Sequence, residues 1–154
     1  MRTEFLSKAK RVDNNTWVTG YYVYHINRTL CALGDSLKPE DEVHYIMQDS
    51  FSDWNMPTHI EAHHIIPKTL CRCTTMKDKI TRPIYEGDII TYQRISVIPE
   101  VGFDGEVVKG VVVYSEHIWM IAITEKDGNE TTASLSRIIK YVGESVEVVG
   151  NIYD

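Results

Sequence analysis

The chain has 154 residues, of which 43% are hydrophobic and 25% charged, and this composition excludes a disordered or fibrous protein. At this length we expect about one domain, with a core large enough to fold without a metal or a disulfide. Sixteen Lys and Arg residues against 22 Asp and Glu give a net charge of −6, which arises in residues 82–154 and argues against a nucleic-acid partner.

The first half of the chain predicts β-strands rich in aromatic and β-branched residues. Residues 17–24 have this composition, and residues 44–47 repeat it. Pro39 is followed by acidic residues and could instead open a short helix running to Met47. The apolar residues of that segment form no helical stripe, so we favour the strand. The polar residues 48–57 then predict a loop.

The second half predicts antiparallel strands joined by tight turns. Strands are expected over residues 89–92, 107–108, 110–114 and, at the end of the chain, 145–153. The clearest hairpin pairs residues 118–124 with residues 130–133 through Asp127 and Gly128. This pair is typical of a two-residue type I′ turn, because both positions of that turn need a positive φ angle.

One helix is expected over residues 134–141, where Ser134 can cap the first turn and Leu135, Ile138 and Ile139 share one face. The fold class is therefore mostly β, with one or two short helices. We expect the core of the second half to contain Ile89, Val111, Val113, Ile121, Ile123, Val148 and Ile152.

One group of residues has the chemistry of a metal site. His59 and His63 project from one face if residues 58–66 form a strand, and Cys71 and Cys73 share a face of the next strand. Imidazole and thiolate groups bind zinc, and a structural site needs four ligands. The C-x-C spacing differs from that of zinc knuckles, so the alternative is exposed histidines and small buried cysteines. We expect no metal or other cofactor, and these four residues remain the candidate ligands.

Motifs for other chemistry are absent from the sequence, which lacks G-x-S-x-G, a P-loop and G-x-G-x-x-G. Glu86 and Asp88 flank a glycine and are interpreted as a turn before a strand, in which Asp88 bonds local amides. Tyr92, Tyr114 and Trp119 could stack on bases in a nucleic-acid-binding barrel. They lie in the acidic half, however, and are interpreted as core or rim residues of the sheet.

Two segments carry a family resemblance. Residues 69–79 lead through Lys-Asp-Lys to Pro-Ile-Tyr-Glu-Gly-Asp-Ile-Ile at residues 83–90, and Val-Glu-Val-Val-Gly-Asn-Ile-Tyr closes the chain at residues 146–153. With an N-terminal strand at residues 2–5, this pattern resembles the YopX family of phage- and prophage-encoded proteins over nearly the whole chain. Residues 27–67, with the histidine-rich strand, are peculiar to this sequence, and Cys71 and Thr75 stand where the family commonly has a glycine. The histidine-rich strand and the C-x-C pair therefore lie outside the family pattern or replace it.

The resemblance implies a small β-barrel fold. An SH3-like part at residues 82–154 is expected to pack with an N-terminal β subdomain at residues 1–81 into one compact unit, with a variable insertion at about residues 27–67. The resemblance assigns no catalytic residues. The motif residues are interpreted as structural, because they set turns, allow close backbone approach or bond the main chain. They are Asp78, Gly87, Asp88, Gly150 and Asn151.

These observations predict a non-enzymatic phage or prophage accessory protein that acts through protein contacts, with its partner undefined and homo-oligomerisation open. We expect it in the cytoplasm of the bacterial host. The longest apolar run, residues 118–123, is too short to span a membrane, the first residues lack the apolar core of a signal peptide, and three cysteines fit a reducing compartment. The alternatives are a zinc-dependent enzyme at the His and Cys group and a nucleic-acid-binding small barrel.

Overall fold

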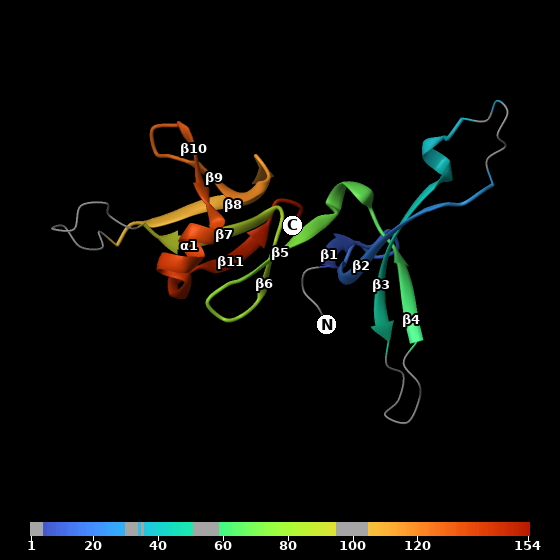
Figure 1. Cartoon of the computed structure of the whole chain (residues 1–154), viewed down its shortest axis with the longest axis horizontal. Helices are drawn as coiled ribbons and strands as arrows, with labels where there is room; N and C mark the ends of the chain where they lie inside the picture. The colour runs from blue at the N-terminus through green and yellow to red at the C-terminus, as the bar shows by residue number, and fades with distance from the viewer. Residues whose placement is uncertain (1–4, 30–33, 35, 51–58, 95–104) are drawn as a thin grey trace, which may run out of the picture. The chain divides into compact units, whose positions relative to one another are not determined.

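The computed structural model describes residues 5–29, 34, 36–50, 59–94 and 105–154 (Figure 1). Within these ranges most residues lie in antiparallel strands and there is one short α-helix, so the predicted mostly β fold is confirmed at this level. None of the described helices is long and apolar enough to cross a membrane. The chain divides into two compact units, residues 1–72 and residues 73–154. The division expected from the sequence, between residues 81 and 82, stays a prediction.

The first unit is built from antiparallel strands. These are β1 (Leu6–Lys10), β2 (Trp17–Ile26), β3 (Glu42–Ser50), β4 (His59–His64) and the start of β5 (Cys71–Lys77), which continues into the second unit. Short 3-10 turns at Pro39–Asp41 and Pro67–Thr69 precede β3 and β5. The strands are hydrogen-bonded in the order β4-β3-β2-β1-β5.

The sheet of the first unit curls until the ends of β1 and β4 meet. Arg11 and Ile65 form an isolated bridge, and the Ile66 N–H donates to the Lys10 carbonyl at 2.8 Å. We call the enclosed side of this sheet the inner face and the opposite side the outer face. The inner face holds the small core of the unit, which consists of Ala9, Val18, Ile46 and Ile65, with Leu70 packed against them.

Both strands predicted for the first unit are confirmed, as β2 and β3, and helical structure after Pro39 is limited to the 3-10 turn. The loop predicted at residues 48–57 is wrong for residues 48–50, which complete β3 because each is paired with a residue of β4. The rest of that loop lies outside the described residues. The strand expected at residues 2–5 also lies outside them except for Phe5, and β1 begins after it.

The second unit contains a curled five-stranded sheet with a helix packed against it. From β5 the chain continues through β6 (Pro83–Tyr85), β7 (Asp88–Gln93), β8 (Val107–Ser115), β9 (Ile118–Thr124), β10 (Glu130–Ser134), α1 (Leu135–Val142) and β11 (Glu147–Asn151). The sheet order is β10-β9-β8-β7-β11, so the last strand returns to pair with β7 (Figure 1). The buried core comprises Ile84, Ile90, Tyr92, Val108, Val112, Ile121, Ile123, Leu135, Ile138, Val142 and Val146.

The predicted hairpin is confirmed as β9 and β10, but the predicted turn type is wrong. The Gly128 N–H donates to the Glu125 carbonyl at 2.9 Å, and the Glu125 N–H donates to the Asn129 carbonyl at 2.8 Å. Of the Asp127-Gly128 pair, only Gly128 has a positive φ, of 85°. The loop is therefore the longer kind that ends in one left-handed glycine, rather than a two-residue turn. Asp127 accepts the Asn129 N–H on its side chain at 3.0 Å, which favours this arrangement.

The core prediction is right for β9 and wrong for β7 and β8. Ile121 and Ile123 are buried as expected, and Val148 packs against the core from a half-buried position. In β7 and β8 the opposite face is buried. The four predicted core residues that lie outside the buried core are Ile89, Val111, Val113 and Ile152.

Asp88 in β7 and Gly110 in β8 explain why the inward faces of these two strands were predicted wrongly. Both strands carry apolar residues on both faces, so alternation alone does not identify the inward face. Asp88 faces inward because backbone and amide groups surround its carboxylate. Gly110 faces inward because a Cβ there would lie 2.4 Å from Cγ2 of Ile121. Ile90 and Val112 lie two residues after Asp88 and Gly110 in the same strands, so they share the inward face and lie in the core.

The predicted helix is confirmed as α1, which begins one residue later than expected. Ser134 precedes it in an extended conformation, but its hydroxyl contacts the Ser136 hydroxyl at 3.0 Å and caps no backbone N–H. Leu135 and Ile138 are buried, and Ile139 packs against the core. A 3-10 turn at Gly143–Ser145 follows α1, so the last strand is shorter than predicted.

Candidate functional site

Residues 69–90 and 146–153, the two segments that carry the family resemblance, are called the signature segments below. They meet in a buried hydrogen-bond cluster of the second unit. Asp88, at the start of β7, is 1% exposed. Its carboxylate accepts the Tyr85 N–H at 2.8 Å and Nδ2 of Asn151 at 2.9 Å. The side-chain oxygen of Asn151, at the end of β11, accepts the Tyr153 N–H at 3.1 Å. The cluster thus joins the β6–β7 turn to the last strand.

The two signature glycines belong to the same junction. Gly87 has a φ of 76°, a conformation that disfavours other residues, and its carbonyl accepts the Ile152 N–H at 3.0 Å. Gly150 lies where the pairing of β11 with β7 shifts register after Val148. Such a bulge lets β11 end at Asn151 with its side chain directed to Asp88.

A second buried carboxylate fixes the turn between β5 and β6. Asp78 accepts the N–H groups of Ile80 and Arg82 at 3.0 and 2.9 Å, and Nε of Arg82 at 2.9 Å. The Arg82 guanidinium also donates to the Val148 carbonyl at 2.8 Å, which ties the turn to β11. Burial by itself raises the pKa of Asp78, but the hydrogen bonds from Arg82 and Ile80 outweigh it and hold that pKa below its ordinary value.

The side chains of Asp78, Asp88 and Asn151 thus form hydrogen bonds with backbone N–H groups of nearby turns. Among the described residues, no buried side-chain nitrogen or oxygen lacks a hydrogen-bond partner. The arrangement provides turn geometry and connects strands that are distant in sequence. The interpretation of Asp78, Asp88 and Asn151 as purely structural residues stays a prediction.

The candidate histidines lie on the inner face of the first unit. His59, Glu61 and His63 alternate along β4 and share one face, as the strand pattern predicts. Glu61 lies between the two rings, with Oε1 3.4 Å from Nε2 of His59 and Oε2 3.6 Å from Nε2 of His63. The Ser50 hydroxyl donates to Glu61 at 2.6 Å and lowers the pKa of this carboxyl.

A tyrosine and a further histidine continue this inner face on the neighbouring strands. The Tyr22 hydroxyl and Nδ1 of His44 are 2.7 Å apart, and Nε2 of His44 lies 3.8 Å from Glu42. Tyr24 contacts the same imidazole edge-on. His44 is thus held by groups of β2 and β3.

The candidate cysteines lie on β5 and are both buried. Sγ of Cys71 donates to the Thr69 carbonyl at 3.3 Å, and Sγ of Cys73 accepts the Thr75 N–H at 3.4 Å. Burial raises the pKa of the Cys73 thiol, which opposes the thiolate form that binds zinc. In the part of the chain that the structure describes, no three His, Cys, Asp or Glu residues are grouped to hold a metal ion.

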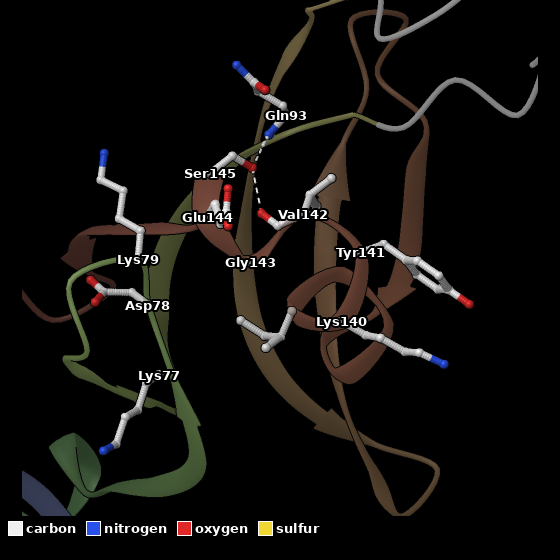
Figure 2. Close-up of a pocket in the computed structure, with 11 residues that line it drawn as sticks. Lys77, Asp78, Lys79, Gln93, Lys140, Tyr141, Val142, Gly143, Glu144 and Ser145 are labelled. Atoms are coloured by element: carbon white, nitrogen blue, oxygen red, sulfur yellow. Dashed lines mark hydrogen bonds between the residues drawn. The ribbon is translucent and has the colours of Figure 1, made fainter.

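A pocket of about 540 Å³ in the second unit lies between the β5–β6 turn and the end of α1. Figure 2 shows three lysines at this pocket, and their side chains extend in different directions. They are Lys77, Lys79 and Lys140. Lys79 is paired with Glu147, and Ser145 bonds the Gln93 N–H and the Val142 carbonyl across the wall. The pocket therefore lacks convergent groups for an anion or a reacting atom.

A second hollow, of about 480 Å³, lies between α1 and strands β7, β9 and β10. We call it the α1 groove. Its apolar lining consists of Tyr92, Ile118, Met120, Ala133, Ile138, Tyr141 and Val142, and its polar lining consists of Arg94, Thr132, Ser134 and Arg137. Tyr141 and Ile118 are 59% and 49% exposed, so the rim of the groove is apolar and open to solvent.

The two arginines of the α1 groove differ in their surroundings. Arg94 lies 2.5 Å from Glu125 and 3.8 Å from Glu106, and the bond to Glu125 raises the pKa of its guanidinium. Within the described residues Arg137 has no ion pair, and it projects from the exposed side of α1. Arg137 therefore leaves an uncompensated positive charge at the groove, whereas the charge of Arg94 is neutralised.

The α1 groove was not predicted from the sequence, although the spacing of two of its residues indicated a shared helix face. Arg137 and Tyr141 are four residues apart in the predicted helix, a spacing that places both on one face. The aromatic residues considered for base stacking have other roles. Tyr92 is buried, which raises its pKa, and Tyr114 contacts Trp119 edge-on with centroids 4.9 Å apart. The interpretation of these three rings as core or rim residues is confirmed.

The family model described as YopX protein matches residues 12–154, which is nearly the whole chain. The matched range includes every strand from β2 to β11, and with them both signature segments. A comparison with curated proteins finds no match. The match agrees with the resemblance that the two signature segments carry.

Proposed function

The chain belongs to the YopX family, and from this premise we propose that it is a non-enzymatic protein-interaction module, an accessory protein of a phage or prophage that works in the cytoplasm of the bacterial host. The second unit is the part proposed to bind the partner protein. One observation carries the proposal: the open edge of β10 lies beside the α1 groove, since Thr132, Ala133 and Ser134 belong to both.

We also propose that the second unit is an SH3-like barrel. Strands β7 to β10 follow one another as an antiparallel meander, and β11 returns to β7 after the short helix α1. A meander of four strands, whose first strand also pairs with the last strand of the chain, supports this topology. The proposal places the partner site at the end of the meander, where the fourth strand of the barrel leads into the helix.

The edge of β10 suits the addition of a partner strand. Among the described strands, β10 is hydrogen-bonded to β9 alone. An edge strand presents outward N–H and C=O groups that another chain can pair with, and proteins often block such edges with lysine or proline. β10 contains neither residue. Its backbone is therefore available to an extended segment.

The α1 groove indicates the chemistry of that segment. Next to the strand edge it offers an apolar lining for one large side chain, which would give specificity to pairing that the backbone alone does not provide. Arg137 adds a positive charge at the rim. We therefore expect the partner to present an extended segment in which a large apolar residue is followed or preceded by an acidic residue.

The non-enzymatic part of the proposal is supported by how the polar residues of the second unit are used. The carboxylates of Asp78 and Asp88 each accept a backbone N–H, and the Asn151 amide at the end of β11 donates to Asp88 at the start of β7. The lysines at the larger pocket diverge (Figure 2). Turnover of any substrate that a single polar substitution abolishes would contradict this part of the proposal.

Selection from a displayed library of random peptides, with the full chain as bait, tests the site. Selected peptides are expected to share a large apolar residue beside Asp or Glu. Tyr141→Ala and Arg137→Gln should each weaken a selected peptide about tenfold, in line with the loss of one well-placed contact. Val149→Ala is the matched control, because Val149 is 52% exposed on β11 and does not line the groove.

Two outcomes would count against the proposed site. One is that no peptide is selected, and the other is that selected peptides bind both groove variants as tightly as the unchanged chain. Sedimentation of the chain alone shows whether a second copy uses the same edge. A dimer dissociated by Tyr141→Ala would identify the partner as the chain itself.

A further inference from the structure

Strand β4 forms one margin of the sheet in the first unit. Among the described strands it pairs along its length with β3 alone, and its far edge meets β1 only at the isolated bridge between Arg11 and Ile65 (Figure 1). β4 contains neither lysine nor proline, the residues that often block such an edge. The edge over residues 59–62 is therefore suited to pairing with another strand.

The hydrogen bonds at the end of β4 show which of its backbone groups point outward. The Ile65 N–H donates to the His44 carbonyl of β3 at 3.0 Å. Such bonding alternates along an antiparallel pair, so the N–H and C=O groups of Ile60, Ala62 and His64 point away from β3. The His64 carbonyl already accepts a backbone N–H from the turn after β1, at 2.9 Å. The outward groups at Ile60 and Ala62 lie beyond that contact.

The side chains of β4 are complementary to the same strand run in the opposite direction. On the inner face the imidazole of His59 is followed two residues later by the carboxylate of Glu61. A second copy related by a two-fold axis at Ile60 places its Glu61 opposite His59, and its His59 opposite Glu61. An imidazole can donate to a carboxylate whether it is neutral or charged, and opposite charges that face each other across antiparallel strands are stabilising.

Ile60 lies on the outer face, at the centre of this arrangement. Its side chain is 66% exposed, more than any other large hydrophobic residue in the described part of the chain. On the two-fold axis it would pack against Ile60 of the second copy, so both side chains would remove apolar surface from water. The outward N–H and C=O groups of the two Ile60 residues would form the two reciprocal hydrogen bonds of a closely spaced pair.

Other ways of pairing two copies are less favourable. An axis at Glu61 would place two carboxylates directly opposite each other, where like charges are destabilising. An axis at Ala62 would pair Ile60 with His64, whose carbonyl is already bonded. The open edge of β10 is not self-complementary, because β10 has no basic residue to oppose Glu130.

The charge distribution of the chain also favours contact between first units. Residues 1–72 contain 8 basic and 9 acidic residues, whereas residues 73–154 contain 8 and 13. The first unit is therefore nearly neutral, and the second unit carries most of the negative charge. Contact between first units brings together the parts of two copies that repel each other least.

We propose that two copies of the chain associate by pairing their β4 strands in antiparallel fashion about Ile60. The partner is a second copy because β4 itself supplies the opposing charges and the central apolar contact. One short strand pair buries little surface, so we expect a reversible dimer with a dissociation constant in or above the micromolar range. This association does not involve the α1 groove and does not rest on the proposed function.

Sedimentation equilibrium of the full chain, from about 5 μM to about 500 μM, tests the proposal. A reversible monomer–dimer equilibrium is expected. Ile60→Ser should weaken it at least about tenfold, because the central contact is lost from both copies. Ile80→Ser is the matched control, since Ile80 is 58% exposed in the turn between β5 and β6, and it should leave the equilibrium unchanged.

A pair of charge variants tests the register of the two strands. His59→Glu opposes two carboxylates, and Glu61→Lys opposes an ammonium group and an imidazole, so each variant alone should associate at least about tenfold more weakly. Mixed in equal amounts, the two variants should form a heterodimer, because the two introduced charges then face each other and the unchanged Glu61 faces the unchanged His59. Both side chains are about half exposed, at 53% for His59 and 45% for Glu61, so the fold tolerates these changes.

The proposal is overturned if the unchanged chain is monomeric at the highest concentration, or if Ile60→Ser associates as tightly as Ile80→Ser. It is also overturned if the mixed charge variants stay monomeric. Tyr141→Ala should leave the dimer intact. A dimer that Tyr141→Ala dissociates and Ile60→Ser does not would be formed at the α1 groove, which would contradict pairing through β4 while supporting the groove as a binding site.

Discussion

Replacing Asp88 with alanine should remove a large fraction of the stability of the second unit. The substitution takes away the acceptor of two donors, the Tyr85 N–H and Nδ2 of Asn151, at a position that is 1% exposed. A buried donor left without its acceptor costs about 1–3 kcal/mol, so two cost about 2–6 kcal/mol. A domain of this size is stabilised by only about 5–15 kcal/mol in total.

Denaturant unfolding of Asp88→Ala, Asn151→Ala and the double variant gives the measurement, with hydrogen exchange of residues 73–154 assigning the loss to the second unit. The double variant should cost about 1–2 kcal/mol less than the sum of the singles, because both remove the same hydrogen bond. Glu144→Ala, an exposed carboxylate change, should stay within about 0.5 kcal/mol. Single variants as stable as that control, or strictly additive costs, would refute the reasoning.

Three further predictions follow from the second unit. Ile90→Ala should cost about 2–5 kcal/mol in thermal or denaturant unfolding and Ile89→Ala less than half of that, and equal costs would contradict the assignment of the inward face. Gly110→Ala should cost about 1–3 kcal/mol by the same assay, because its Cβ would lie 2.8 Å from the Ala122 carbonyl oxygen as well as against Ile121; a neutral change would show that the strands can separate. The pKa of Asp78 is lowered in the folded protein, so its contribution is present above the unfolded pKa and is lost as the pH falls; unfolding midpoints of Asp78→Asn and the unchanged chain should therefore converge as the pH is taken below about 4, and a gap that widens there would be the opposite sign.

The parts of the fold that local sequence determines were predictable. Asp127-Gly128 located the β9–β10 hairpin, and the spacing of Leu135, Ile138 and Ile139 located α1. The alternation of His59, Glu61 and His63 likewise placed these side chains on one face of β4. In each case the signal and the structure involve residues within one element or one turn.

The parts that depend on distant contacts were not predictable in the same way. The apolar residues of β7 alone do not distinguish Ile89 from Ile90, because the choice depends on a hydrogen bond that the Asn151 amide, 63 residues away, donates to Asp88. The α1 groove combines residues of β7, β9, β10 and the helix, so no single segment shows it. The zinc hypothesis for His59 and His63 rested on sequence proximity to the cysteines, which lie buried on β5.

Hydrogen exchange at the backbone amides of β10 examines the proposed function most directly. The full chain is compared with and without a peptide selected for binding to it. If an extended partner segment pairs with the open edge, the outward amides of Glu130–Ser134 become protected. At a peptide concentration near the dissociation constant of the unchanged chain, this protection should be largely lost in Arg137→Gln, which binds about tenfold more weakly. Tight peptide binding that leaves these amides exchanging at the rate of the free protein would contradict the account.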